Sequence, residues 1–455
     1  MNAINAGDTC FVLLCAALVM LMTPGLALFY GGMVRRKNVL ATMTQSFALL
    51  CAIGVQWVVF GYSLAFGPDV KHAIGSLGWA GLRGVGLEPN ADYAATVPHQ
   101  AFMIYQAMFA IITPALISGA IAERMKFRAF MLFSVLWATF VYDPLAHWVW
   151  GAGGFLRDLG ALDFAGGTVV HVSAAASALA AILLVGKRHQ YGERPMPPHS
   201  LVLTLTGAGI LWFGWFGFNA GSALAANGVA VSAFVATNTA AAAAGLGWLV
   251  VEWMRKGKPT ALGLASGAVA GLVAITPAAG YVTPMAAVAI GLAAGALCHV
   301  LVDLRGRTRL DDSLDVLGVH GAGGILGALA TGVFATKAVN AAGGDGLLYG
   351  NAAQLLTQAI AVGVTCVFAF AGSIVILKLV DRLVGLRVTP EEEIAGLDAT
   401  EHGEQGYILE AEGAIALSHA ERVMAEASRA LPAGDGVRRG AAAVEAVEED
   451  APRFE

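Results

Sequence analysis

The sequence is poor in charged residues. Only 13% of its 455 residues are Asp, Glu, Lys or Arg, whereas typical soluble domains carry about 25%. Hydrophobic residues make up 57% of the chain, and the mean hydropathy is +0.69. This composition excludes an ordinary soluble domain and indicates a polytopic membrane protein. The ten-residue alternation of a membrane β-barrel is also lacking, so we expect helices.

Cysteine pairs and an N-terminal basic region are lacking as well. The five cysteines lie in or beside apolar runs without a CxxC pair, which argues against a disulfide framework or a zinc site. No Lys or Arg precedes the first apolar run, whereas a signal peptide would begin with basic residues. We therefore expect this run to stay as the first membrane span.

Eleven apolar runs are long enough to cross about 30 Å of hydrocarbon as helices. They cover residues 9–31, 41–66, 98–121, 127–150, 168–186, 201–223, 231–254, 260–278, 284–303, 316–336 and 351–380. Glycine, with 57 residues, suits helices that pack closely through small side chains. The prediction is an all-α polytopic membrane protein, divided into a transmembrane domain (residues 1–384) and a cytoplasmic tail (residues 385–455).

Basic residues between these runs predict the orientation. Eighteen Lys and Arg residues lie in segments that follow odd-numbered spans, which all emerge on one side of the membrane. Four lie in segments on the other side: Lys71, Arg83, Arg157 and Lys337. Positive charge favours the cytoplasmic side, so we expect the N-terminus outside and the C-terminus inside.

A repeated motif organises the spans. Asp163 precedes His171, and Asp312 precedes His320, by the same eight residues, and each histidine follows a valine. The fifth and tenth spans run in opposite directions, which predicts an inverted repeat of five plus five helices with one helix added. At about 1.5 Å per residue, the two histidines should meet near the membrane midplane. Buried histidines in a membrane indicate function, although hydrogen-bonded packing is the alternative for either one alone.

Two neutral imidazoles in contact offer a polar, uncharged surface to a small neutral molecule. Closer to the outside, Trp150, Phe109, Phe218 and Ser222 supply aromatic faces and a hydroxyl that suit a small N–H-bearing cation. Taken singly, Trp150 could be an interface anchor, and the two phenylalanines could be core packing. Asp163 stands at a helix start, where its carboxylate is predicted to cap the Gly166 or Gly167 amide.

Several long motifs resemble the Amt/Mep/Rh ammonium transporter family, in particular its bacterial Amt branch. The resemblance covers about residues 8–407 and is carried by residues 24–32, 119–124, 146–151, 163–171, 214–222, 315–321, 385–388 and 402–404.

The resemblance implies that the chain is no enzyme but a transporter. It would recruit NH₄⁺ at the outer site, deprotonate it and conduct NH₃ through a hydrophobic pore. His171 and His320 match the twin histidines of the pore. Phe109 and Phe218 match the stacked phenylalanines at its outer mouth, and Phe109, Trp150 and Ser222 match the recruitment site. Asp163 matches the essential acid beside that site.

The resemblance also implies a homotrimer in the cell membrane, methylammonium as a substrate analogue, and a PII signalling protein docking on the tail. No cofactor, metal or nucleic acid is expected. Within the tail, residues 385–407 match the family, and Thr389 to Glu392 predict a capping box. Residues 408–455 are an addition, with a predicted helix at 412–430 and a disordered end, and this departure bears on PII docking rather than on transport.

Other functions stay open. A dedicated ammonium sensor could signal through the long tail, and passage of a neutral gas such as CO₂ is a second alternative. An intramembrane enzyme would need a nucleophile or metal triad, and none accompanies the histidines. Glu123 and Arg124 are expected to form a structural ion pair with each other. Packing or interface roles are expected for Trp148, Trp215 and His147. Asp312 and Asp315 are expected to supply a cap and a vestibule charge.

Overall fold

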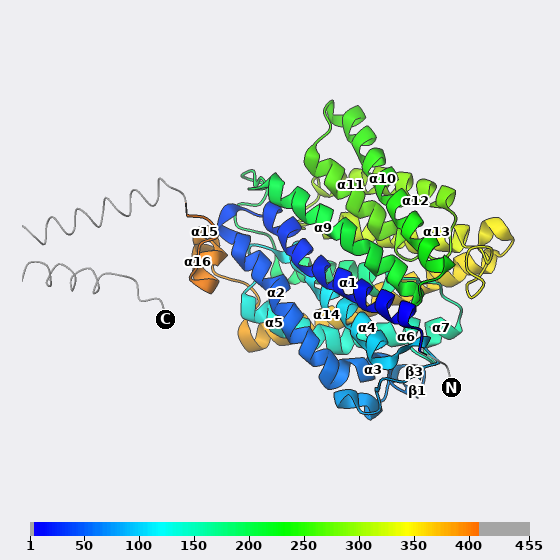
Figure 1. Ribbon diagram of the computed structural model, residues 1–455. Coiled ribbons are helices and arrows are strands. Elements are labelled where there is room, and N and C mark those ends of the chain that lie inside the picture. The colour runs from blue at the N-terminus through cyan, green and yellow to red at the C-terminus, as the bar shows by residue number, and fades with distance from the viewer. Residues whose placement is uncertain (1–3, 409–455) are drawn as a thin grey trace, which may run out of the picture. The chain divides into compact units, whose positions relative to one another are not determined.

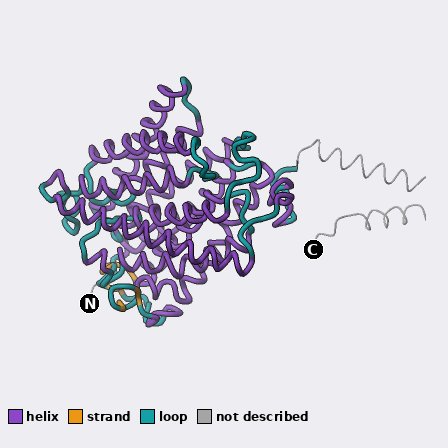
Figure 2. The backbone as a smooth tube through the Cα atoms, turned by 180° about the vertical axis from the view of Figure 1, so that it is seen from behind, coloured by secondary structure: helices purple, strands orange, loops and turns teal. Residues whose placement is uncertain are grey.

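The structure is a computed structural model, and it describes residues 4–408. A compact unit extends to Glu404; of the second unit, Gln405–Glu455, only residues 405–408 are described, and they contain no helix or strand. The helix predicted at 412–430 and the disordered end therefore lie outside the described residues. Figure 2 shows that helices dominate the described chain, with strands confined to one small region.

In the first half of the chain, the elements are α1 (Ala6–Met33), η1 (Arg36–Asn38), α2 (Val39–Gln56), η2 (Trp57–Gly61), α3 (Tyr62–Phe66), β1 (Asp69–Val70), β2 (Ile74–Gly75), η3 (Leu77–Leu82), β3 (Pro89–Asn90), β4 (Ala94–Pro98), α4 (His99–Ile121), α5 (Phe127–Trp137), η4 (Ala138–Tyr142), α6 (Asp143–Trp150), α7 (Phe155–Asp158), η5 (Gly167–Val172) and α8 (Ser173–Val185). Strands β1 and β2 form one antiparallel pair, and β3 and β4 form another.

In the second half, the elements are α9 (Leu201–Ala220), η6 (Gly221–Ala223), α10 (Gly228–Lys256), α11 (Ala261–Ile275), α12 (Pro284–Arg305), η7 (Leu317–Gly321), α13 (Ala322–Phe334), η8 (Leu347–Tyr349), α14 (Ala352–Val384), α15 (Pro390–Ala395) and α16 (Leu397–His402). In Figure 1 the helices from α9 to α13 gather on one side of α1, and α2 to α5 lie on the other.

Ten helical stretches of the described chain are long and apolar enough to cross a membrane, and α11 is a shorter apolar helix. These correspond to the eleven predicted spans, so the predicted all-α membrane fold is confirmed. Polar side chains mark the helix starts: Ser200, Asn227, Thr260 and Thr283 each accept a backbone hydrogen bond as the N-cap of α9 to α12.

Small residues let α1 and α9 approach closely. A Cβ atom added to Gly207 would lie 2.2 Å from the backbone nitrogen of Phe29, and one added to Gly25 would lie 2.7 Å from Ile210. Neither space admits a larger side chain, which is the packing expected between membrane helices with abundant glycine.

The tail segment from residue 385 to Glu404 packs on the helical unit. The predicted capping box is confirmed, because the Thr389 hydroxyl accepts from the Glu392 amide and the Glu392 carboxylate accepts from the Thr389 amide. Asp398 accepts from the amide of Ala41 (2.8 Å) near the start of α2, and Glu401 accepts from that of Phe127 (2.8 Å) at the start of α5. Carboxylates at helix N-termini are favourable, so these contacts hold the tail segment in place.

Candidate functional site

His171 and His320 lie on two short π-helical turns, η5 and η7, which lead into α8 and α13. A π turn contains one extra residue and is often found at functional sites. The chain before each turn includes a residue with positive φ, Gly166 at 114° and Asp315 at 60°. The repeated motif therefore folds into the same local structure twice.

The two acids of the motif cap these turns. The Asp163 carboxylate accepts from the amides of Gly166 (2.9 Å), Gly167 (2.6 Å), Thr168 (2.8 Å) and Val169 (3.2 Å), and from the Thr168 hydroxyl. The predicted cap on Gly166 or Gly167 is thus present, with two further amides. Asp312 is fully buried and accepts from the Leu317 amide at 2.7 Å. Both carboxylates therefore bind the amide five residues ahead.

The imidazoles of His171 and His320 are in contact. Their Nδ1 atoms are 3.3 Å apart, so one ring can donate a hydrogen bond to the other, and the ring centroids are 5.3 Å apart. The residues are 1% and 4% exposed. They border a narrow cavity of about 10 Å³, whose other walls are apolar or aromatic, among them Leu26, Leu116 and Val269. The pair therefore places polar ring nitrogens within otherwise apolar walls.

Trp215, expected from the sequence to be a packing or interface residue, also lines this cavity. Its ring stacks against His171 with 5.6 Å between centroids, and its Nε1 donates to the Thr276 hydroxyl at 2.9 Å. One signal was available, because Trp215 precedes Phe218 by three residues and so shares its helix face.

Phe109 and Phe218 separate the histidine cavity from a larger one, which we call the outer cavity. Their ring centroids are 4.3 Å apart; Phe218 lines the histidine cavity, and Phe109 lines the outer cavity of about 570 Å³. Trp150 and Ser222 line the same outer cavity, and the Trp150 ring meets Phe109 edge to face at 6.0 Å. The structure thus brings together all the outer-site residues named from the sequence.

Hydrogen bonds fix two of these outer residues. Trp150 Nε1 donates to the backbone carbonyl of Asp163 at 2.8 Å, which ties the indole to the capped turn. The Ser222 hydroxyl donates to the Phe218 carbonyl at 2.9 Å and lies 3.2 Å from the Tyr105 hydroxyl. Tyr105 was not predicted as a site residue. It is buried on α4, and its position in an apolar helix is that of an ordinary core residue.

Residues 10–407 match the model of the Ammonium Transporter Family. The chain belongs to this family. It is 55% identical to an ammonium transporter of Bacillus subtilis, with 88% of this chain and 98% of the relative aligned. It is 50% identical to ammonium transporter Amt1 of Archaeoglobus fulgidus, over 88% of this chain and 99% of that one. These relatives are transporters rather than enzymes.

Solved structures agree with the family assignment. Mep2 of Saccharomyces cerevisiae is 36% identical, with a TM-score of 0.80 over 85% of this chain and 91% of the other. A protein described as a sensor Amt protein is 31% identical, with a TM-score of 0.80 over 87% of this chain and 98% of the other.

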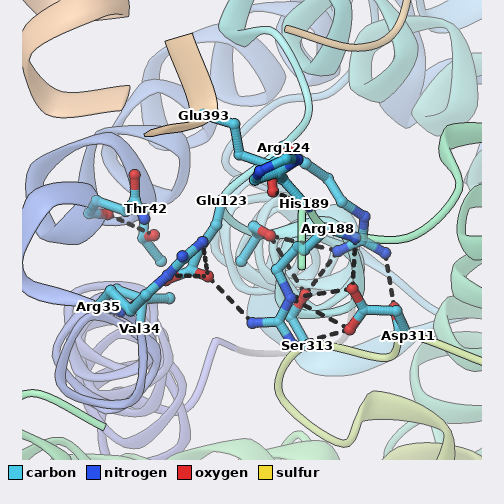
Figure 3. Close-up of polar contacts among 12 residues, drawn as sticks. Val34, Arg35, Thr42, Glu123, Arg124, Arg188, His189, Asp311, Ser313 and Glu393 are labelled. Atoms are coloured by element: carbon cyan, nitrogen blue, oxygen red, sulfur yellow. Dashed lines mark hydrogen bonds and ion pairs between the residues drawn. The ribbon is translucent and has the colours of Figure 1, made fainter. Parts of the chain in front are cut away.

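A buried charge network lies at the end of the helical unit where the tail begins (Figure 3). Glu123 pairs with Arg35 (2.8 Å) and with Arg188 (3.1 Å), and Arg188 pairs with Asp311 (2.8 Å). The predicted ion pair between Glu123 and Arg124 is therefore wrong. The Arg124 guanidinium donates instead to backbone carbonyls, including that of Asp311, and to the Ser313 hydroxyl. Neighbours in sequence diverge here because Glu123 has a positive φ of 72°.

The remaining predicted residues have structural contacts. His147 is buried and contacts the Ala65 carbonyl (3.0 Å) and Asp69 (2.9 Å), and Trp148 donates to the Ala73 carbonyl. Asp315 pairs with Arg305 at 2.5 Å. His147 and Trp148 thus anchor the segment from Ala65 to Ala73, which agrees with the packing role expected for them.

Proposed function

We propose that the chain transports ammonium through a pore formed within one subunit. One observation carries the proposal: two contacting imidazoles lie in a narrow apolar cavity directly beside a pair of phenylalanine rings in contact. Such a passage suits a small neutral molecule with hydrogen-bond donors and an acceptor, and ammonia is such a molecule. Membership of the ammonium transporter family supports the same substrate.

Recruitment occurs in the outer cavity. The faces of Trp150 and Phe109 attract NH₄⁺ by cation–π contact, worth about 0.5–2 kcal/mol, and the Ser222 oxygen accepts a hydrogen bond. Asp163 acts indirectly in this proposal. Its carboxylate is occupied by four amides and a hydroxyl, so it holds the turn in place and adds a negative potential without touching the cation.

The cation loses its proton at the phenylalanine pair. An ammonium ion without a counter-ion would cost many kcal/mol in the apolar cavity, whereas neutral ammonia crosses at much lower cost. Ammonia then passes along His171 and His320. His171 Nε2 is buried and has no hydrogen-bond partner among the described residues, so it can serve the passing molecule.

The proton has two routes. It stays outside, and transport is electroneutral, or it follows along the imidazole pair. In the second case each crossing responds to the membrane potential, by about 2.3 kcal/mol per 100 mV. Uptake measured at clamped potentials separates the two.

The proposal includes the cell membrane as the site of action, with the N-terminus outside and the basic end in the cytoplasm. Supporting it is the excess of Lys and Arg on that end. The proposal also includes assembly as a homotrimer and docking of a PII protein on the tail. Both parts rest on the family resemblance. Crosslinking in membranes and co-purification with PII test these two parts.

Methylammonium uptake into proteoliposomes tests the pore. His171→Ala and His320→Ala should each alter uptake strongly, because each removes half of the polar lining. His299→Ala is a matched control, since His299 is equally buried but does not line the histidine cavity. Unchanged uptake in both pore variants would refute the role given to the histidines.

A second candidate function is ammonium sensing, favoured by the likeness to the sensor Amt protein and by the sequence beyond residue 407. Deletion of residues 408–455 separates the two functions. A sensor would lose its ammonium-dependent signal and keep uptake, whereas a transporter without a sensing role would keep both its uptake and the cell's ammonium response.

A further inference from the structure

A second cavity, separate from the pore, lies at the basic end of the helices. It encloses about 310 Å³ and is walled by three segments that are distant in sequence. Arg35 and Lys37 come from the α1–α2 connection, His189 and Arg194 come from the α8–α9 connection, and Glu393 comes from α15. We refer to it as the basic cavity.

The single carboxylate of the basic cavity is already neutralised. One oxygen of Glu393 accepts from the His189 amide at 2.5 Å, and the other accepts from the Arg387 guanidinium at 2.9 Å (Figure 3 shows Glu393 beside His189). Glu393 is also 1% exposed. Its two oxygens are therefore both engaged, and neither makes an ion pair with Lys37 or Arg194.

Two of the cations that face the cavity, Lys37 and Arg194, form no ion pair among the described residues, and the third, Arg35, shares its carboxylate. Lys37 Nζ donates to the backbone carbonyls of Glu393 (2.9 Å) and Ile394, which are neutral. The exposed side chain of Arg194 has no ion pair within residues 4–408. Arg35 shares its carboxylate, Glu123, with Arg188. The cavity thus carries excess positive charge.

We propose that the basic cavity binds a phosphate group. Arginine and lysine are the side chains that recognise phosphate, by charge-assisted hydrogen bonds from several donors at once. The cavity also lies where apolar helices end, and basic residues at such ends attract anionic headgroups. Two sources share this chemistry: a phospholipid headgroup, which the apolar Pro195, Met196 and Ile394 of the wall would suit, and a soluble phosphate.

Binding would have a structural consequence, because α15 forms one wall. Lys37 already packs against this segment, and a Cβ atom on Gly396 would lie 2.6 Å from Lys37. An anion bridging Lys37 and Arg194 would tie the tail segment to both connections. The site would therefore link phosphate binding to the position of the tail.

The test uses the purified full-length protein in a zwitterionic detergent. Binding of inorganic phosphate and of dihexanoyl phosphatidylglycerol below its micellar concentration is measured by calorimetry. Arg194→Gln should weaken binding about tenfold, which corresponds to about 1.4 kcal/mol and to one lost charge-assisted hydrogen bond. Arg194→Lys should recover part of the affinity. Because Arg194 is exposed, neither change should affect folding.

Lys258→Gln provides the matched control, since Lys258 is an exposed cation at the same end but outside the basic cavity. Binding of phosphate identifies a soluble ligand, and binding of the lipid alone identifies a headgroup site; both support the proposal. It is overturned if neither probe binds, or if Lys258→Gln weakens binding as much as Arg194→Gln. None of these measurements depends on transport.

Discussion

Replacement of Arg188 by Met should destabilise the protein more than any exposed charge change. Arg188 holds two buried carboxylates together: Nη1 lies 3.1 Å from Glu123, while Nε and Nη2 bind Asp311 at 3.0 and 2.8 Å. The side chains of Glu123 and Asp311 are both 0% exposed. Methionine fills the volume but leaves Asp311 without its bidentate partner.

The expected loss is about 3–5 kcal/mol, the cost of removing one partner from a buried ion pair. Glu123 retains Arg35, so the loss should fall toward the lower part of that range. Arg255 gives the contrast. It binds Asp303 at the same 2.8 Å, but these side chains are 39% and 23% exposed. An exposed pair contributes about 0–1 kcal/mol, and Arg255→Met should cost no more than that.

The pH dependence of this loss follows from Asp311. Burial alone would raise the pKa of Asp311, but hydrogen bonds from Arg188 and the charges of Arg124 and Arg188 outweigh it, so the pKa is lowered. A carboxyl group whose pKa is lower in the folded than in the unfolded state stabilises the fold. The stabilisation is complete at pH values above the unfolded-state pKa of about 3.9, and it disappears as the pH falls through the folded-state pKa. The difference between wild type and Arg188→Met should therefore shrink in acid.

Unfolding in mixed micelles titrated with SDS, repeated between pH 7 and pH 3, measures both effects. A loss below about 1 kcal/mol at pH 7, equal to that of Arg255→Met, would show that the network is not a stabilising contact. A loss that stays constant to pH 3 would show that the ionised form of the carboxylates is not what Arg188 stabilises.

Two further predictions concern the cap at Asp163 and the close packing of helices. Asp163→Ala removes the acceptor of four amides and should lower the free energy of unfolding by about 2 kcal/mol in the same assay. Asp163→Asn should cost less. Equal stability of Asp163→Ala and wild type would contradict the cap. Gly119→Ala should cost about 1–3 kcal/mol, because the new Cβ would lie 2.6 Å from the Tyr30 ring. Gly54→Ala, with its nearest atom 3.9 Å away, should be tolerated, and similar losses in both would refute the steric argument.

Much of the fold was predictable because a membrane restricts the solutions. An apolar run of twenty residues must be helical in lipid, so the spans could be located without knowing their partners. The contact between His171 and His320 was predictable for a different reason. The repeated spacing from Asp163 and Asp312 fixed the depth of each histidine on its own span.

The polar contacts between connections could not be predicted. Glu123 pairs with Arg188, 65 residues away, and not with the adjacent Arg124, because the backbone reverses at Glu123. Trp215 was expected to be a packing residue, because the sequence of an apolar helix does not distinguish an aromatic side chain that lines a cavity from one that packs in the core. Its place beside His171 depends on how α9 crosses η5, which is a tertiary property.

The π turns explain why the hydrophobic pattern alone does not place the imidazoles. Successive residues of an α-helix are rotated by about 100°, so one extra residue moves every later side chain by that angle. His171 and His320 lie within such turns, and the helices that follow, α8 and α13, consist almost entirely of apolar and small residues, which leaves no amphipathic stripe to reveal the shift. What fixes the turns is the pair of carboxylates, Asp163 and Asp312, each bound to the amide five residues ahead. The repeated acid therefore positions the repeated histidine, and the two belong to one structural unit.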